Sequence, residues 1–329
     1  RDALAASPDI NAASVTALRD PGRIGLHMTG VEIGDAQNGL SAPDLNVYAP
    51  LTAPTTMTVA LPAQMDLRVD AVPMQITLTE GLAHATIAPT HEMAIQRAGV
   101  HAQAVAVDGV PMADALDLNI RLVHMGAAAP AGSRAAYAVG IAADGLMIGG
   151  LPDRLDVTGP IQLWLTEVPG QPMLEGRVPP PALTGLQTQG VRFVLGDMQA
   201  TLVGRIQADA EGFAEGEAAF YTADARPFVD AAVQAGLIPQ DAAMLMGALV
   251  KNLSETPVPS DAEAATTRKQ AAAELLPQAD PNLIPDLDQA VALPPAQKGQ
   301  IRLPLILKDG KIRLGPVPIG PAPRLIAAP

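Results

Sequence analysis

The amino-acid sequence predicts a mainly β protein whose strands follow one another as an antiparallel meander. Apolar and polar residues alternate over most of the chain from about residue 22 to residue 221, and turn pairs such as Asp-Gly separate many of the alternating runs. Helical spacing is confined to one stretch before the C-terminus. Closely spaced strands indicate antiparallel pairing rather than strand–helix–strand units. We therefore expect one large curved sheet, a β-sandwich or a taco-like groove, with a small helical insertion before a C-terminal β-hairpin.

Residues 1–22 are expected to form an N-terminal segment that follows an anchor or signal. The chain begins with Arg1 rather than Met, which is consistent with removal of such a segment. The β-rich body is predicted over residues 23–225. Its first strand covers Ile24 to Ile33, where Thr29-Gly30 shifts the phase of the alternation and so predicts a β-bulge.

The rest of the body contains ten further candidate strands. Glu80-Gly81, Asp108-Gly109, Asp144-Gly145 and Gly159-Pro160 are interpreted as turns between some of them. The predicted strands cover residues 65–71, 74–79, 82–87, 93–107, 116–122, 137–141, 155–165, 191–195, 198–206 and 213–221.

The pattern changes near residue 226. Residues 226–276 are predicted to be a helical insertion, with short helices at 226–236 and 239–252 and an exposed helix near 261–276. An acidic, proline-rich loop follows at 277–300. Residues 301–329 are predicted to form a hairpin and an extended tail that complete the sheet, because period-two runs flank Asp309-Gly310, a pair that tolerates the positive φ of a tight turn.

Composition excludes several classes of function. The net charge of −13 opposes binding to nucleic acid, and the absence of cysteine excludes disulfides, iron–sulfur clusters, thiol nucleophiles and Cys-based zinc sites. Residues 242–250, the longest apolar run, fall far short of the ~20 residues that span a bilayer. Hydrophobic residues make up 48% of the chain but aromatic residues only 2%, which suits a sheet interior or acyl chains, since both need apolar area rather than ring stacking.

No motif of catalysis, metal binding or cofactor binding is present in the sequence. The histidines do not form HExxH, no serine lies in GxSxG, and the glycines at 145–150 are not followed by Lys-Ser/Thr. We therefore predict a protein that is not an enzyme and has no cofactor and no metal. The histidines are His27, His84, His91, His101 and His124.

Apolar strand positions are the candidate binding residues. Roughly thirty aliphatic side chains would share one face of the predicted sheet, and burial of each is worth about 2 kcal/mol. Such a face must be covered by curling, by a second sheet, by helices or by an apolar ligand. The residues expected to line an apolar groove are Leu67, Ile76, Leu118, Ile120, Leu163, Leu202 and Leu305.

The C-terminal segment resembles a known family. The run from Leu303 to Ile312, with Leu314-Gly315-Pro316-Val317-Pro318-Ile319-Gly320 and the residues to Leu325, is similar to the closing motif of the alphaproteobacterial family called domain of unknown function 2125. The resemblance implies an exported envelope protein with an N-terminal anchor and a β-rich periplasmic part. By analogy with the AsmA-like envelope proteins, it also implies a role in lipid handling.

Two functions follow as expectations. The first is a non-catalytic periplasmic protein, tethered to the inner membrane by an N-terminal segment not present in this chain, that binds or shields phospholipid acyl chains in an apolar groove. The second is a structural or interaction subunit of a membrane-associated complex, which would dock a membrane-protein partner through its acidic exterior, its helices or its tail. The sequence identifies neither a lipid nor a partner.

Overall fold

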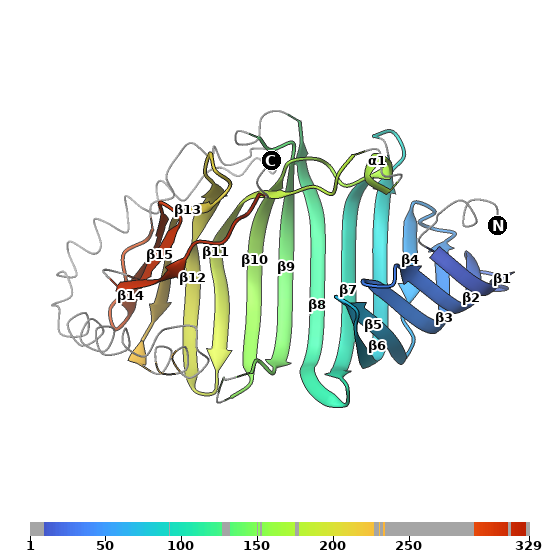
Figure 1. Cartoon of the computed structure of the whole chain (residues 1–329), viewed down its shortest axis with the longest axis horizontal. Coiled ribbons are helices and arrows are strands. Elements are labelled where there is room, and N and C mark those ends of the chain that lie inside the picture. The colour runs from blue at the N-terminus through green and yellow to red at the C-terminus, as the bar shows by residue number, and fades with distance from the viewer. Residues whose placement is uncertain are drawn as a thin grey trace. The chain divides into compact units, whose positions relative to one another are not determined.

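A computed structural model describes residues 10–91, 93–126, 132–149, 151, 153–174, 178–226, 230, 233, 293–314 and 317–326. The strands within these residues form a 16-stranded antiparallel sheet in which most neighbours in sequence are also neighbours in space (Figure 1). The predicted fold class, a mainly β antiparallel meander with a C-terminal hairpin, is therefore confirmed. The predicted helical insertion at 226–276 and the acidic loop at 277–300 lie largely outside the described residues.

The chain divides into two compact units, which are described separately. Unit 1 comprises residues 1–121, 140–147 and 169–179, and unit 2 comprises residues 122–139, 148–168 and 180–329. Unit 1 contains a four-residue helix, α1 (Gln171–Leu174), and seven complete strands. These strands are β1 (Ile10–Ala17), β2 (Arg23–Gly34), β3 (Gly39–Pro50), β4 (Thr56–Ala60), β5 (Gln64–Val69), β6 (Val72–Ala88) and β7 (Ala94–Val107).

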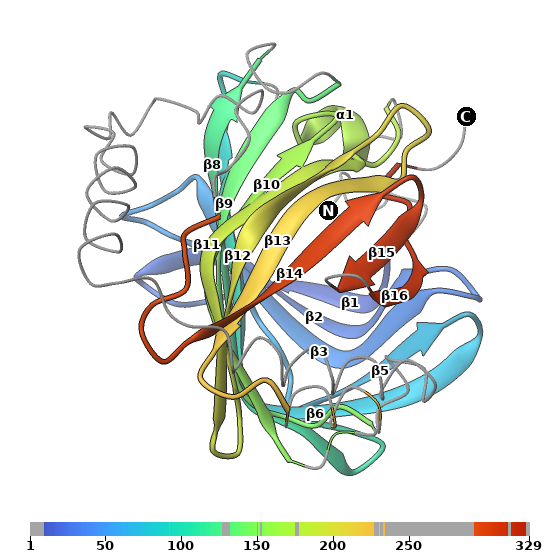
Figure 2. The same ribbon diagram turned by 90° about the vertical axis from the view of Figure 1, so that its left-hand side faces the viewer.

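Strands β8 (Val110–Met125) and β9 (Ala135–Leu146) contribute residues to both units. In unit 2, β12, β13 and β14 run side by side, as Figure 2 shows. The complete strands of unit 2 are β10 (Leu155–Leu165), β11 (Leu183–Leu195), β12 (Met198–Ala208), β13 (Ala214–Thr222), β14 (Ile301–Lys308), β15 (Lys311–Leu314) and β16 (Val317–Pro321).

Local sequence explains the tight hairpins. Asp309 and Gly310 connect β14 to β15 with φ angles of 52° and 68°, and Asp108 and Gly109 connect β7 to β8 with 50° and 76°. Both central residues of each turn thus have the positive φ that a type I′ turn requires, and that turn matches the right-handed twist of the strands it joins. The turns predicted at these two pairs are confirmed.

Three other residue pairs that contain one glycine are predicted to be turns but lie inside strands. Glu80, with a φ of 52°, lies in the middle of β6, where the register with β7 shifts. Gly159 lies inside β10, where the register with β11 shifts between Thr158 and Gln162. Asp144-Gly145 lies near the end of β9. Glycine permits unusual backbone angles in a bulge as readily as in a turn, so the residue type alone does not distinguish them.

Strands β4 and β5 together act as one interrupted strand. β4 pairs with one half of β3 and with residues 82–86 of β6, while β5 pairs with the other half of β3 and with residues 72–77. The break falls at residues 61–63, which contain Pro62, and a proline cannot donate a ladder hydrogen bond. The N–H of Leu61 still donates to the carbonyl of Gly81, at 2.9 Å, so the interrupted strand stays attached to β6.

A crease crosses several strands of unit 1. In a regular strand, residues on one face are two apart, but in four strands here two core-facing residues are three apart. The predicted phase break at Thr29-Gly30 is one member of this line, and Gly30 has a φ of 56°. We use the term crease for this line of extra residues. The core-facing pairs are Ala12 and Val15 in β1, Met28 and Val31 in β2, Ala42 and Leu45 in β3, and Ala102 and Val105 in β7.

The crease explains how the strands of unit 1 bury a core. Bulged strands bend and twist more strongly than regular ones, so the apolar face beside the crease folds toward itself. Val31 is 1% exposed and Leu45 is 4% exposed as a result, in one cluster with Met28, Met65 and Leu78.

Candidate functional site

An apolar face extends across the strands of unit 1. Residues directly opposite each other in antiparallel strands share a face, so the strand register traces it from β2 to β8. The row on this face is Leu26, Val47, Val59, Ala83, Val100 and Leu118, and the next row toward the strand ends is Met57, Ala85, Ala98 and Ile120.

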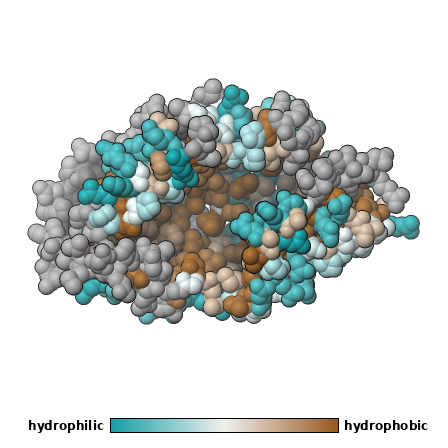
Figure 3. All heavy atoms as spheres, in the orientation of Figure 1, coloured by the Kyte–Doolittle hydropathy of each residue, from teal (hydrophilic) through white to brown (hydrophobic). Residues whose placement is uncertain are grey.

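Part of this face is closed and part is open. Leu26, Val47 and Val59 pack against the core cluster beside the crease. Met57, Val100 and Leu118 are instead 48%, 42% and 41% exposed, and we call these three residues the open patch. Hydrophobic side chains of the described residues are likewise visible at the surface in Figure 3. Exposed apolar groups that adjoin one another indicate a binding surface more often than scattered ones do.

Small side chains lie between the members of the open patch. Ala83, Ala85 and Ala98 occupy the positions that connect Met57 to Val100 and Leu118. An alanine projects little above the backbone, so this part of the face is a low floor bordered by longer aliphatic chains. Such a surface offers apolar area without a directional polar contact.

The opposite face of the same strands is polar. His27 Nδ1 is 2.9 Å from Asn46 Oδ1, the hydroxyls of Thr56 and Thr86 are 2.9 Å apart, and His101 Nδ1 is 3.4 Å from Asp117 Oδ2. These cross-strand pairs all lie on residues that alternate with the apolar ones. One side of unit 1 is therefore suited to water and the other to apolar material.

Unit 2 has an apolar face of its own, which is more completely covered. Leu202 lies opposite Phe220, which in turn lies opposite Leu303, and the rings of Phe193 and Phe220 meet edge to face with centroids 6.1 Å apart. Leu303 is 3% exposed. A second cluster joins Leu305, Leu307 and Ile312 with residues of the C-terminal tail.

The structure places all seven predicted groove residues on the apolar faces of their units. In unit 1, Leu118 belongs to the open patch and Ile120 is half-buried beside it, whereas Ile76 packs against the core cluster. Leu67, also half-buried, lies opposite Leu40 in the pocket described below. In unit 2, Leu163 lies opposite Leu186, Leu202 opposite Phe220 and Leu305 opposite Ala218.

Sequence reasoning missed two members of the open patch. Met57 lies in β4, which was not predicted because five residues carry too short an alternation to be recognised. Val100 lies in a correctly predicted strand, but the crease reverses the alternation of faces near Ala104, partway along this strand. The alternation alone therefore does not assign a face to Val100. Only the pairing of Val100 with Leu118 identifies it.

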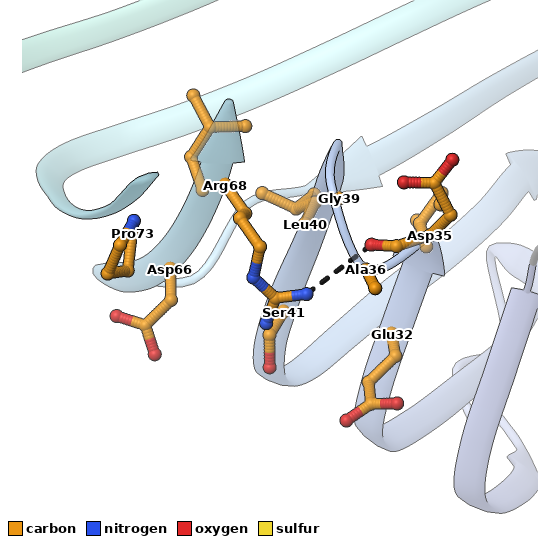
Figure 4. A pocket seen from close by; sticks show the side chains of 12 residues that line it. Glu32, Asp35, Ala36, Gly39, Leu40, Ser41, Asp66, Arg68 and Pro73 are labelled. Carbon is orange, nitrogen blue, oxygen red and sulfur yellow. Dashed lines mark hydrogen bonds between the residues drawn. The ribbon is translucent and has the colours of Figure 1, made fainter. Parts of the chain in front are cut away.

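A shallow pocket of about 650 Å³ lies at the turn between β2 and β3, beside β5 and the start of β6 (Figure 4). Arg68 extends across it, and its Nη1 donates to the backbone carbonyl of Asp35 at 3.3 Å. The carboxyl of Asp35 accepts hydrogen bonds from the backbone N–H groups of Asn38 and Gln37, each at 2.7 Å, and these lower its pKa below the ordinary value. Asp35 therefore serves to hold the turn between β2 and β3.

The pocket contains two carboxylates besides Asp35, those of Glu32 and Asp66. Glu32 and Asp66 lie on either side of Ser41 on three neighbouring strands and are open to solvent. Among the residues that the structure describes, no group of three or more His, Asp or Glu side chains has an arrangement that could hold a metal ion. Within the same residues, no helix has the length and apolar character needed to cross a bilayer.

The fold and its surfaces thus define a mainly β protein built from antiparallel strands, with one apolar and one polar side in unit 1. The chain belongs to the family described as "Uncharacterized protein conserved in bacteria (DUF2125)", whose model matches residues 21–323. The family resemblance inferred from the C-terminal segment is therefore confirmed, and it covers nearly the whole chain. No curated protein and no solved structure matches the chain.

Proposed function

We propose that this protein is a non-catalytic component of the bacterial cell envelope that binds or shields the acyl chains of a phospholipid. The observation that supports the proposal is the open patch: Met57, Val100 and Leu118 are each more than 40% exposed on the face that also carries Leu26, Val47 and Val59 of the core cluster. Leaving this area in water is unfavourable, and an alkyl chain would cover it at about 0.8 kcal/mol for each methylene buried.

The chemistry of the surface favours an alkyl chain over other apolar ligands. Its members are methionine, valine, leucine and alanine, and it offers neither an aromatic ring for stacking nor a buried polar group to orient a ring system. Methionine and leucine side chains adapt to an irregular, flexible ligand. The alanine floor between them leaves space along the strands for an extended chain.

We further propose a periplasmic location with attachment to the inner membrane. The membership in a bacterial family and the absence of cysteine in the sequence are compatible with this location. Fractionation of a bacterium that expresses the full-length protein provides the test. Cleavage of the chain by protease added to spheroplasts supports the proposal. Protection of the chain from this protease until the cells are lysed contradicts it.

Native mass spectrometry with lipid extraction tests the binding function. Protein purified gently from a bacterial envelope is expected to carry phospholipid in a defined stoichiometry. The double substitution Leu118→Asp, Ile120→Asp places two charges on the apolar face of β8 and is expected to abolish the bound lipid in a chain that remains folded. Leu118→Met is the matched control, since it keeps the apolar area, and should retain the lipid.

A polypeptide that carries no lipid after gentle purification would contradict the proposal. Equal lipid content in the wild type and in the Leu118→Asp, Ile120→Asp variant would also contradict it, because the lipid would then lie elsewhere. In the lipid-free case, recovery of a membrane-protein partner from native membranes would support the alternative role as an interaction subunit.

A further inference from the structure

Strand β1 is an edge of the sheet that carries neither a charged residue nor a proline. Among the described residues it pairs only with β2, so one side of its backbone has no strand beside it. Its sequence, Ile-Asn-Ala-Ala-Ser-Val-Thr-Ala, contains no charged residue, proline or glycine. Exposed edges often carry charged residues or proline, because these prevent pairing with another strand. The other end of the strand order shows the contrast, since β16 contains Pro318 and Pro321.

The crease gives β1 a palindromic pattern of faces. Ala12 and Val15 pack against the core of unit 1, and Ala17 lies opposite Leu26, which packs there too. Ile10 lies opposite Ile33, whose other neighbour, Leu40, also contacts the core. The four remaining residues face the polar side: Asn11, Ala13, Ser14 and Thr16. The order of apolar and polar faces along β1 is therefore the same in both directions.

This pattern favours the pairing of β1 with β1 of a second copy of the chain. Directly opposite residues of an antiparallel pair point to the same face, so every in-facing residue must lie opposite another in-facing one. Two copies of β1 satisfy this over all eight residues when the two-fold axis passes between Ala13 and Ser14. Ala13 then lies opposite Ser14 of the second copy, and Ala12 lies opposite Val15 of the second copy. A shift by one residue breaks the match.

We propose that two copies of this chain associate along β1 in this antiparallel register, so that their sheets join edge to edge. The uncharged strand allows this approach despite the net charge of −13, because no like charges oppose each other directly at the seam. The apolar faces of the two copies of unit 1 lie on the same side of the joined sheet, since a two-fold axis perpendicular to a sheet preserves its faces.

Sedimentation equilibrium of the full chain over a range of concentrations tests the association. The wild type is expected to form a dimer. Ala13→Lys and Ser14→Glu each place two like charges beside the two-fold axis and should raise the dimer dissociation constant by about tenfold or more. An equimolar mixture of the two variants should recover the dimer, because each lysine then lies opposite a glutamate. Val72→Lys, at an exposed position in the hairpin between β5 and β6, is the matched control and should dimerise like the wild type.

Three results would overturn the proposal. A wild-type chain that stays monomeric at every concentration would show that β1 does not pair with a second copy. A dimer whose dissociation constant is unchanged by Ala13→Lys forms through another surface, provided that circular dichroism shows the variant to be folded. A chain that dimerises only after deletion of residues 1–9 uses that segment, rather than a second copy, to occupy the edge.

Discussion

The hydroxyl of Tyr221, in β13, donates a hydrogen bond to the backbone carbonyl of Pro294 at 2.6 Å, across 73 positions of sequence. Tyr221 is 6% exposed and forms a cluster with Val203 and Ala219, on which Leu293 packs. The residues that lead into β14 are thus attached to the sheet by one polar and one apolar contact. Tyr221→Phe keeps the ring and removes only the polar contact.

We expect Tyr221→Phe to lower the free energy of unfolding by about 1 kcal/mol, because the carbonyl of Pro294 loses its partner in a half-buried place. Denaturant titration followed by circular dichroism measures the change. Thr158→Val, at an exposed position in β10, is a control that should change stability by less than about 0.5 kcal/mol. Equal stability of Tyr221→Phe and the wild type would show that the hydrogen bond does not hold this segment.

The tight approach of β12 and β13 predicts a second effect. A methyl group at Gly204 would collide with both Cα and Cβ of Ala218 on the neighbouring strand, whereas a methyl group at Gly140 in β9 would meet no atom within 4 Å. Gly204→Ala should therefore destabilise the protein by about 1–3 kcal/mol or more through overpacking. Gly140→Ala should be neutral or slightly stabilising. Thermal unfolding of the two variants, side by side, checks the difference, and equal melting temperatures would contradict it.

Burial of Tyr137 predicts a dependence of stability on alkaline pH. Burial raises the pKa of Tyr137 to about 12, from an ordinary value of 10.0. The folded state therefore keeps this proton when the unfolded chain has already lost it. The stabilising contribution is complete below pH 10.0 and is lost as the pH rises from there through about 12.

Urea titrations at a series of pH values between about 9 and 12 measure this loss, and Tyr137→Phe is the control. The slope of stability against pH should be less steep in Tyr137→Phe than in the wild type. Identical slopes would show that Tyr137 ionises in the folded state as it does in the unfolded one.

The fluorescence of Trp164 provides a direct check of the fold. Trp164 is the single tryptophan of the chain, is 0% exposed and forms a cluster with Ala136. Its emission should lie well to the blue of free indole, resist quenching by acrylamide, and shift to the red on unfolding. Emission at the wavelength of a solvated indole in the native protein would contradict the position of β10.

Local patterns in the sequence predict much of this fold but not its register. The Asp309-Gly310 hairpin depends on two adjacent residues, and its φ angles follow from their chemistry. Strands β1 and β3 were not predicted, because the crease interrupts their alternation after three or four residues. The alternation in the sequence predicts that Leu118 and Ile120 share an apolar face, but the exposure of Leu118 depends on which strands bend over it. That bending results from bulges in several strands at once, and no single strand reveals it.

The crease also couples the lengths of neighbouring strands. Each of β1, β2 and β3 contains one additional residue at the same level, so their pairing stays in step while the core-facing side is preserved. Removal of Ala13 alone would turn the residues beyond it to the opposite side and expose the ones that pack against Met28. A viable shortening must therefore remove one residue from each of these strands together, so we expect insertions and deletions among relatives to fall in the hairpin loops and to avoid this line.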